Sequence, residues 1–137
     1  MRIRRALPQD ITPAVGLART LGLDYPGLEG DALWVAEDGG RIVGLVALKD
    51  HDDCRELCAL GVDPGFRGRG AAKALVGALL AEAPGDVHLA TVIPGFFEAC
   101  GFTRARDIPA TFPARRETFW CEGCPQERCT VMVRQRS

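Results

Sequence analysis

The chain has 137 residues, of which 47% are hydrophobic and 26% charged, and its formal net charge is −1. This length predicts a single domain over residues 1–137, with enough apolar residues for a real core. The near-neutral charge argues against a nucleic-acid partner, because such proteins usually carry a clear basic excess. The N-terminal residues lack a signal-peptide pattern, and no apolar run reaches the length of a membrane span. We therefore expect a cytoplasmic protein with no membrane partner.

Hydrophobic patterning along the chain predicts alternating strands and helices. Asp10 is placed to cap the first helix, and the Asp38-Gly39-Gly40 sequence between two apolar runs is a strong hairpin signal. This order of elements predicts an α/β or α+β domain around a mixed sheet. We expect, in chain order, a strand at 1–7, a helix at 11–21, strands at 32–38, 41–50 and 54–62, a helix at 70–83, a strand at 86–92, a helix at 94–100, a strand at 101–107, a loop at 108–128 and a strand at 129–135.

The stretch "LGVDPGFRGRGAAKALVGALL" at residues 60–80 places glycines and arginines directly before a helix pattern. Helix N-termini leave backbone N–H groups unpaired and carry partial positive charge, so they bind phosphates. Glycines allow a ligand close to the backbone, and Arg67 and Arg69 add charge. The pattern predicts a pyrophosphate cradle, and the alternative is a glycine-rich turn that only starts the helix.

Two common nucleotide motifs do not fit this stretch. A P-loop would need Lys at position 71 and Ser or Thr at position 72, but both residues are Ala. A dinucleotide-binding fingerprint that begins at Gly68 would need Gly or Ala at position 73, where the chain has Lys73. The phosphate ligand is therefore of another kind.

The same stretch resembles the acyl-CoA-binding motif of the Gcn5-related N-acetyltransferase (GNAT) superfamily. Arg67, Gly70 and Ala72 match the core of that motif, Val62–Pro64 match its lead-in, and "FFEACGF" at Phe96–Phe102 is similar to the superfamily's second motif. The resemblance covers roughly residues 1–104. It implies a mixed, mostly antiparallel central sheet flanked by helices. It also implies transfer of an acetyl group from acetyl-CoA to the primary amine of a small molecule.

The resemblance implies a cofactor site in two parts. The diphosphate of acetyl-CoA would lie on backbone amides after the third meander strand, and that strand would hold the pantetheine and polarise the acetyl carbonyl. The residues expected at the diphosphate are Arg67, Gly68, Arg69, Gly70, Ala71 and Ala72, and those expected at the pantetheine are Leu60, Gly61 and Val62.

Glu56 is the candidate catalytic residue, since the attacking amine must lose a proton to a base. Strand alternation would place Glu56, Cys58, Leu60 and Val62 on one face unless a bulge intervenes. The alternative for Glu56 is a surface carboxylate. A general acid is harder to identify, because Phe97 stands where many members have Tyr. Phe96 and Phe97 are expected to pack, and the only tyrosine, Tyr25, lies in a predicted loop.

A narrower resemblance, to short single-domain N-acetylglutamate synthase-like members, covers the C-terminal part. Cys121, Cys124, Pro125 and Cys129 match a cysteine pattern found there. An amino acid such as glutamate is therefore a candidate acceptor, and a homodimer is left open. Members that acetylate glutamate tend to carry Arg two residues after the candidate base, where this chain has Cys58; Arg4, Arg55 or Arg115 are the candidate replacements.

The three C-terminal cysteines have alternative interpretations. Zinc at Cys121, Cys124 and Cys129 would need a fourth ligand, for which His51, Cys54 and His88 are candidates, and we do not favour it. Redox chemistry is a weaker alternative, and packing thiols that brace the acceptor cleft are the favoured one. As isolated residues, His51 and His88 are expected to be ordinary polar side chains. The rival functions are a non-catalytic acyl-CoA or metabolite sensor and a metal- or redox-responsive protein.

Overall fold

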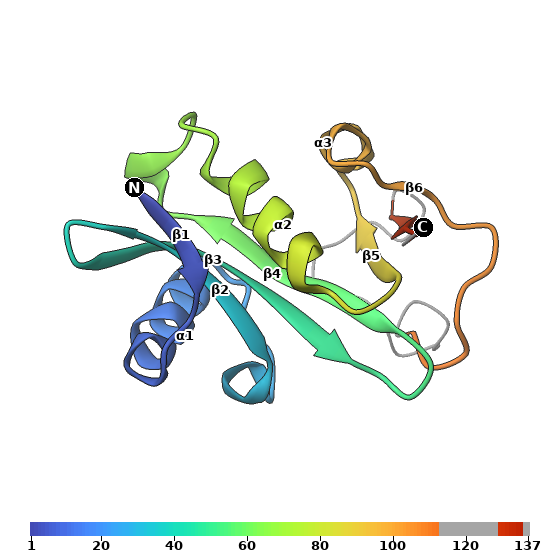
Figure 1. Ribbon diagram of the computed structural model, residues 1–137, viewed down its shortest axis with the longest axis horizontal. Helices are drawn as coiled ribbons and strands as arrows, with labels where there is room; N and C mark the ends of the chain where they lie inside the picture. Colours follow the sequence, from blue (N-terminus) through green and yellow to red (C-terminus); the bar gives the residue numbers. More distant parts are fainter. Residues whose placement is uncertain (113–128, 136–137) are drawn as a thin grey trace. The chain divides into compact units, whose positions relative to one another are not determined.

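The structure is a computed structural model that describes residues 1–112 and 129–135 (Figure 1). Its strands pair in the order β1-β2-β3-β4-β5-β7-β6, and the registered pairs are antiparallel except for β4 with β5. The mixed, mostly antiparallel sheet with helices is therefore confirmed. The elements are β1 Arg2–Arg5, α1 Ile11–Thr20, β2 Ala32–Asp38, β3 Arg41–Asp50, β4 Arg55–Val62, α2 Ala71–Glu82, β5 Val87–Thr91, α3 Pro94–Ala99, β6 Thr103–Arg104 and β7 Thr130–Arg134, with 3-10 turns at Pro8–Asp10, Leu28–Gly30 and Pro64–Phe66.

The chain forms two compact units. The first contains residues 1–49 and 57–82, and the second contains residues 50–56 together with the described residues from 83 onward. Strand β4 contributes its first two residues to the second unit and the rest to the first. None of the helices in residues 1–112 and 129–135 is long and apolar enough to serve as a membrane-crossing segment.

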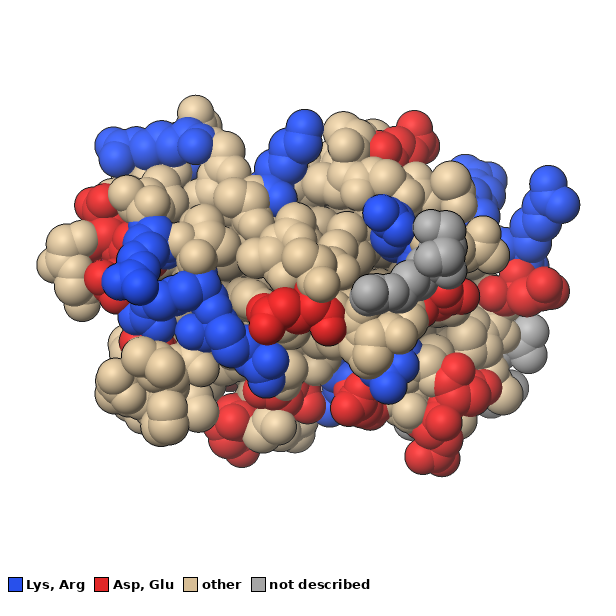
Figure 2. Space-filling model, viewed as in Figure 1, with Lys and Arg blue, Asp and Glu red and all other residues tan. Residues whose placement is uncertain are grey.

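The core of the first unit follows from two-residue alternation in β2 and β3. One set of side chains packs with α1, and the neighbouring positions face the other way. On that other face Gly44 leaves room for Leu75 of α2, because a Cβ built on Gly44 would lie only 3.2 Å from the Leu75 side chain. The buried residues of the α1-side cluster are Ala14, Ala18, Leu28, Leu33, Val35, Leu45 and Ala47. Helix α2 packs against β1 and β2. Figure 2 shows a band of basic side chains where β1 lies, in keeping with its sequence RIRR.

The β2–β3 hairpin confirms the turn prediction. Gly39 and Gly40 have φ values of 57° and 83°, and Asp38 pairs with Arg41 across the turn. Two consecutive residues with positive φ are typical of a type I′ turn, whose twist matches that of the flanking strands. The glycines at these positions avoid the steric cost that a Cβ would add.

Strand β4 does not keep its alternation. Ala59 has a φ of 53°, and the two buried residues of the strand, Leu57 and Val62, are five positions apart. Cys58 and Ala59 both pack against the α1-side cluster, although consecutive strand residues normally point to opposite faces. The strand is therefore irregular at Ala59, as expected of a bulge. The expectation that Cys58 shares a face with Leu60 and Val62 is wrong for this reason.

Asp10 precedes α1, but its side chain makes no capping hydrogen bond to that helix. Its carboxylate instead accepts a hydrogen bond from the backbone N–H of Leu7 at 2.7 Å and forms an ion pair with Arg4. The Arg4 guanidinium also lies 2.6 Å from the carboxylate of Glu37. The capping prediction was wrong because Arg4 and the preceding 3-10 turn compete for the same carboxylate. This buried pairing ties β1 to the start of α1.

We expect Asp10→Asn to lower the free energy of unfolding at neutral pH by about 1–3 kcal/mol, as hydrogen bonds to charged groups contribute on this order. The hydrogen bond from Arg4 lowers the pKa of Asp10. The contribution is therefore complete above the pKa of an unfolded Asp, about 3.9, and is lost as the pH falls below it. Urea unfolding at neutral and acidic pH measures both effects. A wild-type advantage that stays constant in acid would contradict the assignment.

Strand β6 is shorter than predicted, with only Thr103–Arg104 in register with β7. The rest of the predicted segment turns away after the backbone bond from Ala105 to Val131. Of the predicted long loop at 108–128, only residues up to 112 lie within the described part of the chain.

Candidate functional site

The loop that follows β4 is held in shape by its own side chains. The Asp63 carboxylate accepts the Gly65 N–H at 2.9 Å and the Arg41 guanidinium at 3.0 Å. The Arg67 side chain folds back and donates to the carbonyl of Val62 at 3.1 Å. The chain between β4 and α2 is therefore a defined turn, built by residues that the sequence motif contains and by Arg41, which it does not.

The last residues of this turn before α2 include two glycines, which leave the backbone there without side chains. Gly68 and Gly70 have φ values of 81° and 78°, and neither has an atom within 4 Å of the position a Cβ would take. Helix α2 begins at Ala71, so the amides of its first turn have no partner inside the helix. The exposed Arg69 guanidinium stacks over Phe66 at 5.0 Å from the ring centre. A helix start preceded by exposed glycines and an exposed arginine can bind an anion such as a phosphate.

The β4 residues expected at the cofactor lie at the end of that strand. Leu60 and Gly61 are partly buried, and Val62 is buried. A Cβ on Gly61 would approach Leu23 and would lie 2.9 Å from Leu21, so close packing after α1 favours glycine there. The strand residues and the Arg67–Ala72 turn belong to the same compact unit.

In the second unit, the structure brings the candidate base Glu56 together with His51. The His51 Nε2 atom lies 2.8 Å from Glu56 Oε1, and the two side chains are only 10% and 13% exposed. In this geometry an Nε2–H of His51 can donate to the Glu56 carboxylate, which accepts. His51 is therefore not isolated in the fold, and its expected character as an ordinary polar side chain stays a prediction. One sequence signal could have predicted the pair. His51 follows one predicted hairpin strand, and Glu56 lies near the start of the next.

A third group, Phe112, covers His51. Its fully buried ring lies 6.4 Å from His51 and 5.9 Å from His88 between ring centres. Asp53 anchors the preceding segment, because its carboxylate accepts the N–H groups of Ala110 at 2.9 Å and Thr111 at 3.2 Å, and also the Thr111 hydroxyl. The bond from that hydroxyl lowers the pKa of Asp53. The turn between β3 and β4 thus binds, through Asp53, a segment more than fifty residues further along the chain.

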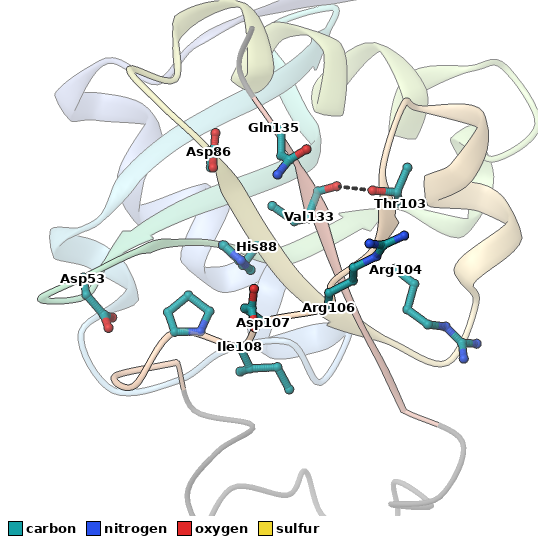
Figure 3. Close-up of a pocket in the computed structure, with 11 residues that line it drawn as sticks. Asp53, Asp86, His88, Thr103, Arg104, Arg106, Asp107, Ile108, Val133 and Gln135 are labelled. Carbon is teal, nitrogen blue, oxygen red and sulfur yellow. Dashed lines mark hydrogen bonds between the residues drawn. The ribbon is translucent and has the colours of Figure 1, made fainter.

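His88 lies beside a pocket of about 500 Å³ (Figure 3). It projects from β5 toward the segment that carries Asp107, and Asp53 and Asp86 also line the pocket. Burial lowers the pKa of His88, although Asp86 and Asp53 act in the opposite direction. Its Nδ1 atom is buried without a partner among the described residues. A neutral imidazole is the form that this environment favours.

Tyr25 does not have a free hydroxyl. The hydroxyl donates to Asp31 at 2.6 Å, and the Lys49 ammonium lies 5.0 Å from the ring centre. Burial, together with the Asp31 bond, raises the pKa of Tyr25. The phenol therefore retains its proton within a network of the first unit.

The aromatic residues of α3 pack as predicted. Phe97 is buried and forms edge-to-face contacts with Phe96 at 5.0 Å and Phe102 at 5.7 Å between ring centres. Phe97 has no group that could donate a proton. It acts in the core of the second unit.

Arg4 and Arg55, two of the three candidates for binding an acceptor carboxylate in place of Cys58, already form ion pairs with acidic side chains. Arg4 is paired with Asp10 and Glu37, and Arg55 lies 3.2 Å from Asp50. Arg115 lies outside the described residues.

The zinc and cysteine predictions fall largely outside the described part of the chain. Cys121 and Cys124 are not among the described residues, whereas Cys129 is, with a partly buried side chain. Within residues 1–112 and 129–135, no group of three or more His, Cys, Asp or Glu side chains could hold a metal ion. Zinc at the C-terminal cysteines thus stays a prediction that we do not favour.

A mixed sheet that leads through a turn with two positive-φ glycines into helix α2 defines the α/β architecture of this protein. The family model described as acetyltransferase (GNAT) family matches residues 9–105, more than half of the chain. The chain belongs to this family, as the motifs at Val62–Ala72 and Phe96–Phe102 indicated.

The chain is also similar to curated proteins over a shorter stretch. N-acetylaspartate synthetases of Rattus norvegicus and Homo sapiens are each 48% identical to it over 48 residues. The match covers 34% of this chain but only 16% of the length of those relatives.

Solved structures share the fold over nearly the whole chain. Rv2747 from Mycobacterium tuberculosis, in complex with CoA, matches with a TM-score of 0.74 and 23% identity over 100% of both chains. N-acetylglutamate synthase from Neisseria gonorrhoeae, complexed with coenzyme A and N-acetyl-glutamate, matches with a TM-score of 0.70 and 20% identity, over 98% of this chain and 34% of that one. At these identities the likeness establishes the fold.

Proposed function

We propose that this chain transfers the acetyl group of acetyl-CoA to the primary amine of a small molecule. The observation that carries the proposal is the turn from Arg67 to Ala72, in which two positive-φ glycines expose the start of α2 beside two arginines. A diphosphate requires both close backbone approach and positive charge. Family membership supports the identity of the ligand, since the motif that matches acyl-CoA binding is this same turn.

The remaining cofactor contacts would come from the end of β4. In this proposal the backbone of Leu60, Gly61 and Val62 holds the pantetheine and polarises the acetyl carbonyl. Donors aimed at the oxygen where negative charge develops are usually a large term in acyl transfer. The irregular backbone at Ala59 supports such a role, because a bulge leaves ladder groups of the strand unpaired.

Glu56 is the proposed general base. A proton passes from the ammonium nitrogen of the acceptor to the Glu56 carboxylate, and the neutral amine then attacks the acetyl carbonyl carbon. The carbon–sulfur bond breaks and the CoA thiolate leaves. The second proton, which the nitrogen loses as it becomes an amide, passes through solvent and the thiolate takes up a proton from solvent. The low exposure of Glu56, at 13%, supports this role over that of a freely solvated surface carboxylate.

Amino acids are the acceptor class that we propose to test first, with glutamate among them. The structural likeness to an N-acetylglutamate synthase complexed with N-acetyl-glutamate supports this choice. The chain departs from that pattern at Cys58, and the engagement of Arg4 and Arg55 leaves neither as a ready carboxylate ligand. Aspartate and non-acidic amines therefore belong in the same panel.

The test is a panel of amino acids and simple amines, with release of the CoA thiol as the readout. We expect amine-dependent thiol release with at least one member, and calorimetric binding of acetyl-CoA in the absence of amine. Binding without turnover on any amine would favour a non-catalytic acyl-CoA sensor. Failure to bind acetyl-CoA would overturn the proposed function altogether.

A further inference from the structure

The side chain of His51 is held in place by its surroundings in the second unit. Its backbone N–H donates to the carbonyl of Cys54 at 2.9 Å, which closes the hairpin turn. Its ring packs against the edge of Phe112, and Asp53 fixes the segment before that phenylalanine. With the ring 90% out of solvent and its Nε2–H directed at Glu56, His51 has little freedom to turn away.

The contact with His51 restricts the orientation of the Glu56 carboxylate. A hydrogen bond of 2.8 Å to Oε1 limits rotation of the Glu56 side chain about its last bond. General-base catalysis depends on such orientation, because the base must lie within hydrogen-bond reach of the proton it removes. A displacement of about 1 Å at a reacting group can cost on the order of 10²-fold in rate.

We propose that His51 is a positioning residue that orients the Glu56 carboxylate toward the acceptor ammonium. The inference rests on the proposed function and adds a residue to it. His51 itself touches neither the acceptor nor acetyl-CoA in this scheme. The proton still moves from the ammonium nitrogen to Glu56, and His51 keeps its Nε2 proton throughout. The hydrogen bond from that proton sets where the accepting oxygen lies.

The cavity beside His51 gives the experiment a specific readout. About 400 Å³ of space adjoins the histidine, lined mainly by Asp50, Asp52, Asp53 and Asp86 with Arg55 and His88. Free imidazole can therefore enter next to the position that a His51→Ala variant vacates. The acidic lining favours entry of the imidazolium form as well as the neutral one.

The experiment compares His51→Ala and His51→Gln in the acetyl-transfer assay. We expect His51→Ala to lower kcat by roughly tenfold or more, with an unchanged KM for acetyl-CoA. Glutamine offers an N–H donor at a similar distance along its side chain, so His51→Gln should recover much of the rate. Added imidazole should raise kcat of His51→Ala. His88→Ala is the matched control, because it removes the other imidazole that contacts Phe112, and imidazole should not restore its rate.

Each outcome decides the proposal. Normal kcat in a folded His51→Ala variant, with an active wild type, overturns the positioning role and leaves the proposed function intact. A loss that neither glutamine nor imidazole restores, and that parallels lower thermal stability, assigns His51 to structure alone and also overturns it. If the wild type binds acetyl-CoA but turns over no amine, the proposed function fails first and the positioning role with it.

Discussion

Gly70→Asp should weaken acetyl-CoA binding by about 100-fold, because it places a negative charge where the proposed diphosphate lies. Two unit charges 4 Å apart near a protein surface interact by about 4 kcal/mol before further screening, and about 2.7 kcal/mol corresponds to 100-fold. The position has open space for a side chain, since no atom lies within 4 Å of a Cβ built there. Calorimetric titration with acetyl-CoA measures the loss.

Gly70→Asn is the matched control for this experiment. Gly70 has a φ of 78°, so any side chain there adds backbone strain. Asparagine has the shape of aspartate without its charge and tolerates positive φ comparatively well. Both variants should therefore show similar losses of stability and of close backbone approach, whereas only the aspartate adds charge repulsion and should bind acetyl-CoA more weakly than the asparagine. Wild-type affinity in both variants would remove the diphosphate from this turn.

Glu56→Gln should lower kcat on the order of 10²-fold while leaving acetyl-CoA affinity unchanged. Glutamine keeps the shape and can still contact His51, but it cannot accept the acceptor's proton. Positioned general-base catalysis typically contributes 10²–10⁴-fold, so the lower end of that range, about 10²-fold, is the smallest effect consistent with the role. Steady-state rates at saturating amine across the pH range measure it.

Glu98→Gln provides the comparison for Glu56→Gln. Glu98 is an exposed glutamate of α3 in the same unit, and its replacement removes one carboxylate without touching His51. We expect its kcat to stay near that of the wild type. If the two variants behave alike at every pH, Glu56 is not the base and the proton leaves by another route.

Local sequence patterns predicted much of the fold because they depend on neighbouring residues. The Asp38-Gly39-Gly40 turn and the glycine-opened start of α2 each follow from a few adjacent residues whose backbone needs are specific. The same is true of the acyl-CoA motif, whose residues are consecutive, so that the sequence alone predicts a diphosphate site at the Arg67–Ala72 turn.

The features that were missed depend on contacts made by the folded chain. The positive φ of Ala59 has no local sequence signal, because alanine ordinarily avoids that conformation. Asp10 was assigned as a cap because Arg4 could not be known to reach it. The bonds from Asp53 to Thr111 join residues 58 apart, and no periodic pattern predicts a contact of that span. The contact of His51 with Glu56 likewise forms only when the hairpin turn brings the two side chains together.

The amides of residues 110 and 111 are held by a single carboxylate, so we expect loss of its charge to release that segment locally. Asp53 is exposed, so protons reach it without global opening of the protein. Its pKa is lowered by the bonds that it accepts, so those bonds persist above the usual pKa of an aspartate and weaken as the pH falls below it. The protection factors of the Ala110 and Thr111 amides, which correct for the slower intrinsic exchange in acid, should consequently fall before those of the strands. Packing of Phe112 on the two histidines then depends on a charge at the tip of a distant hairpin.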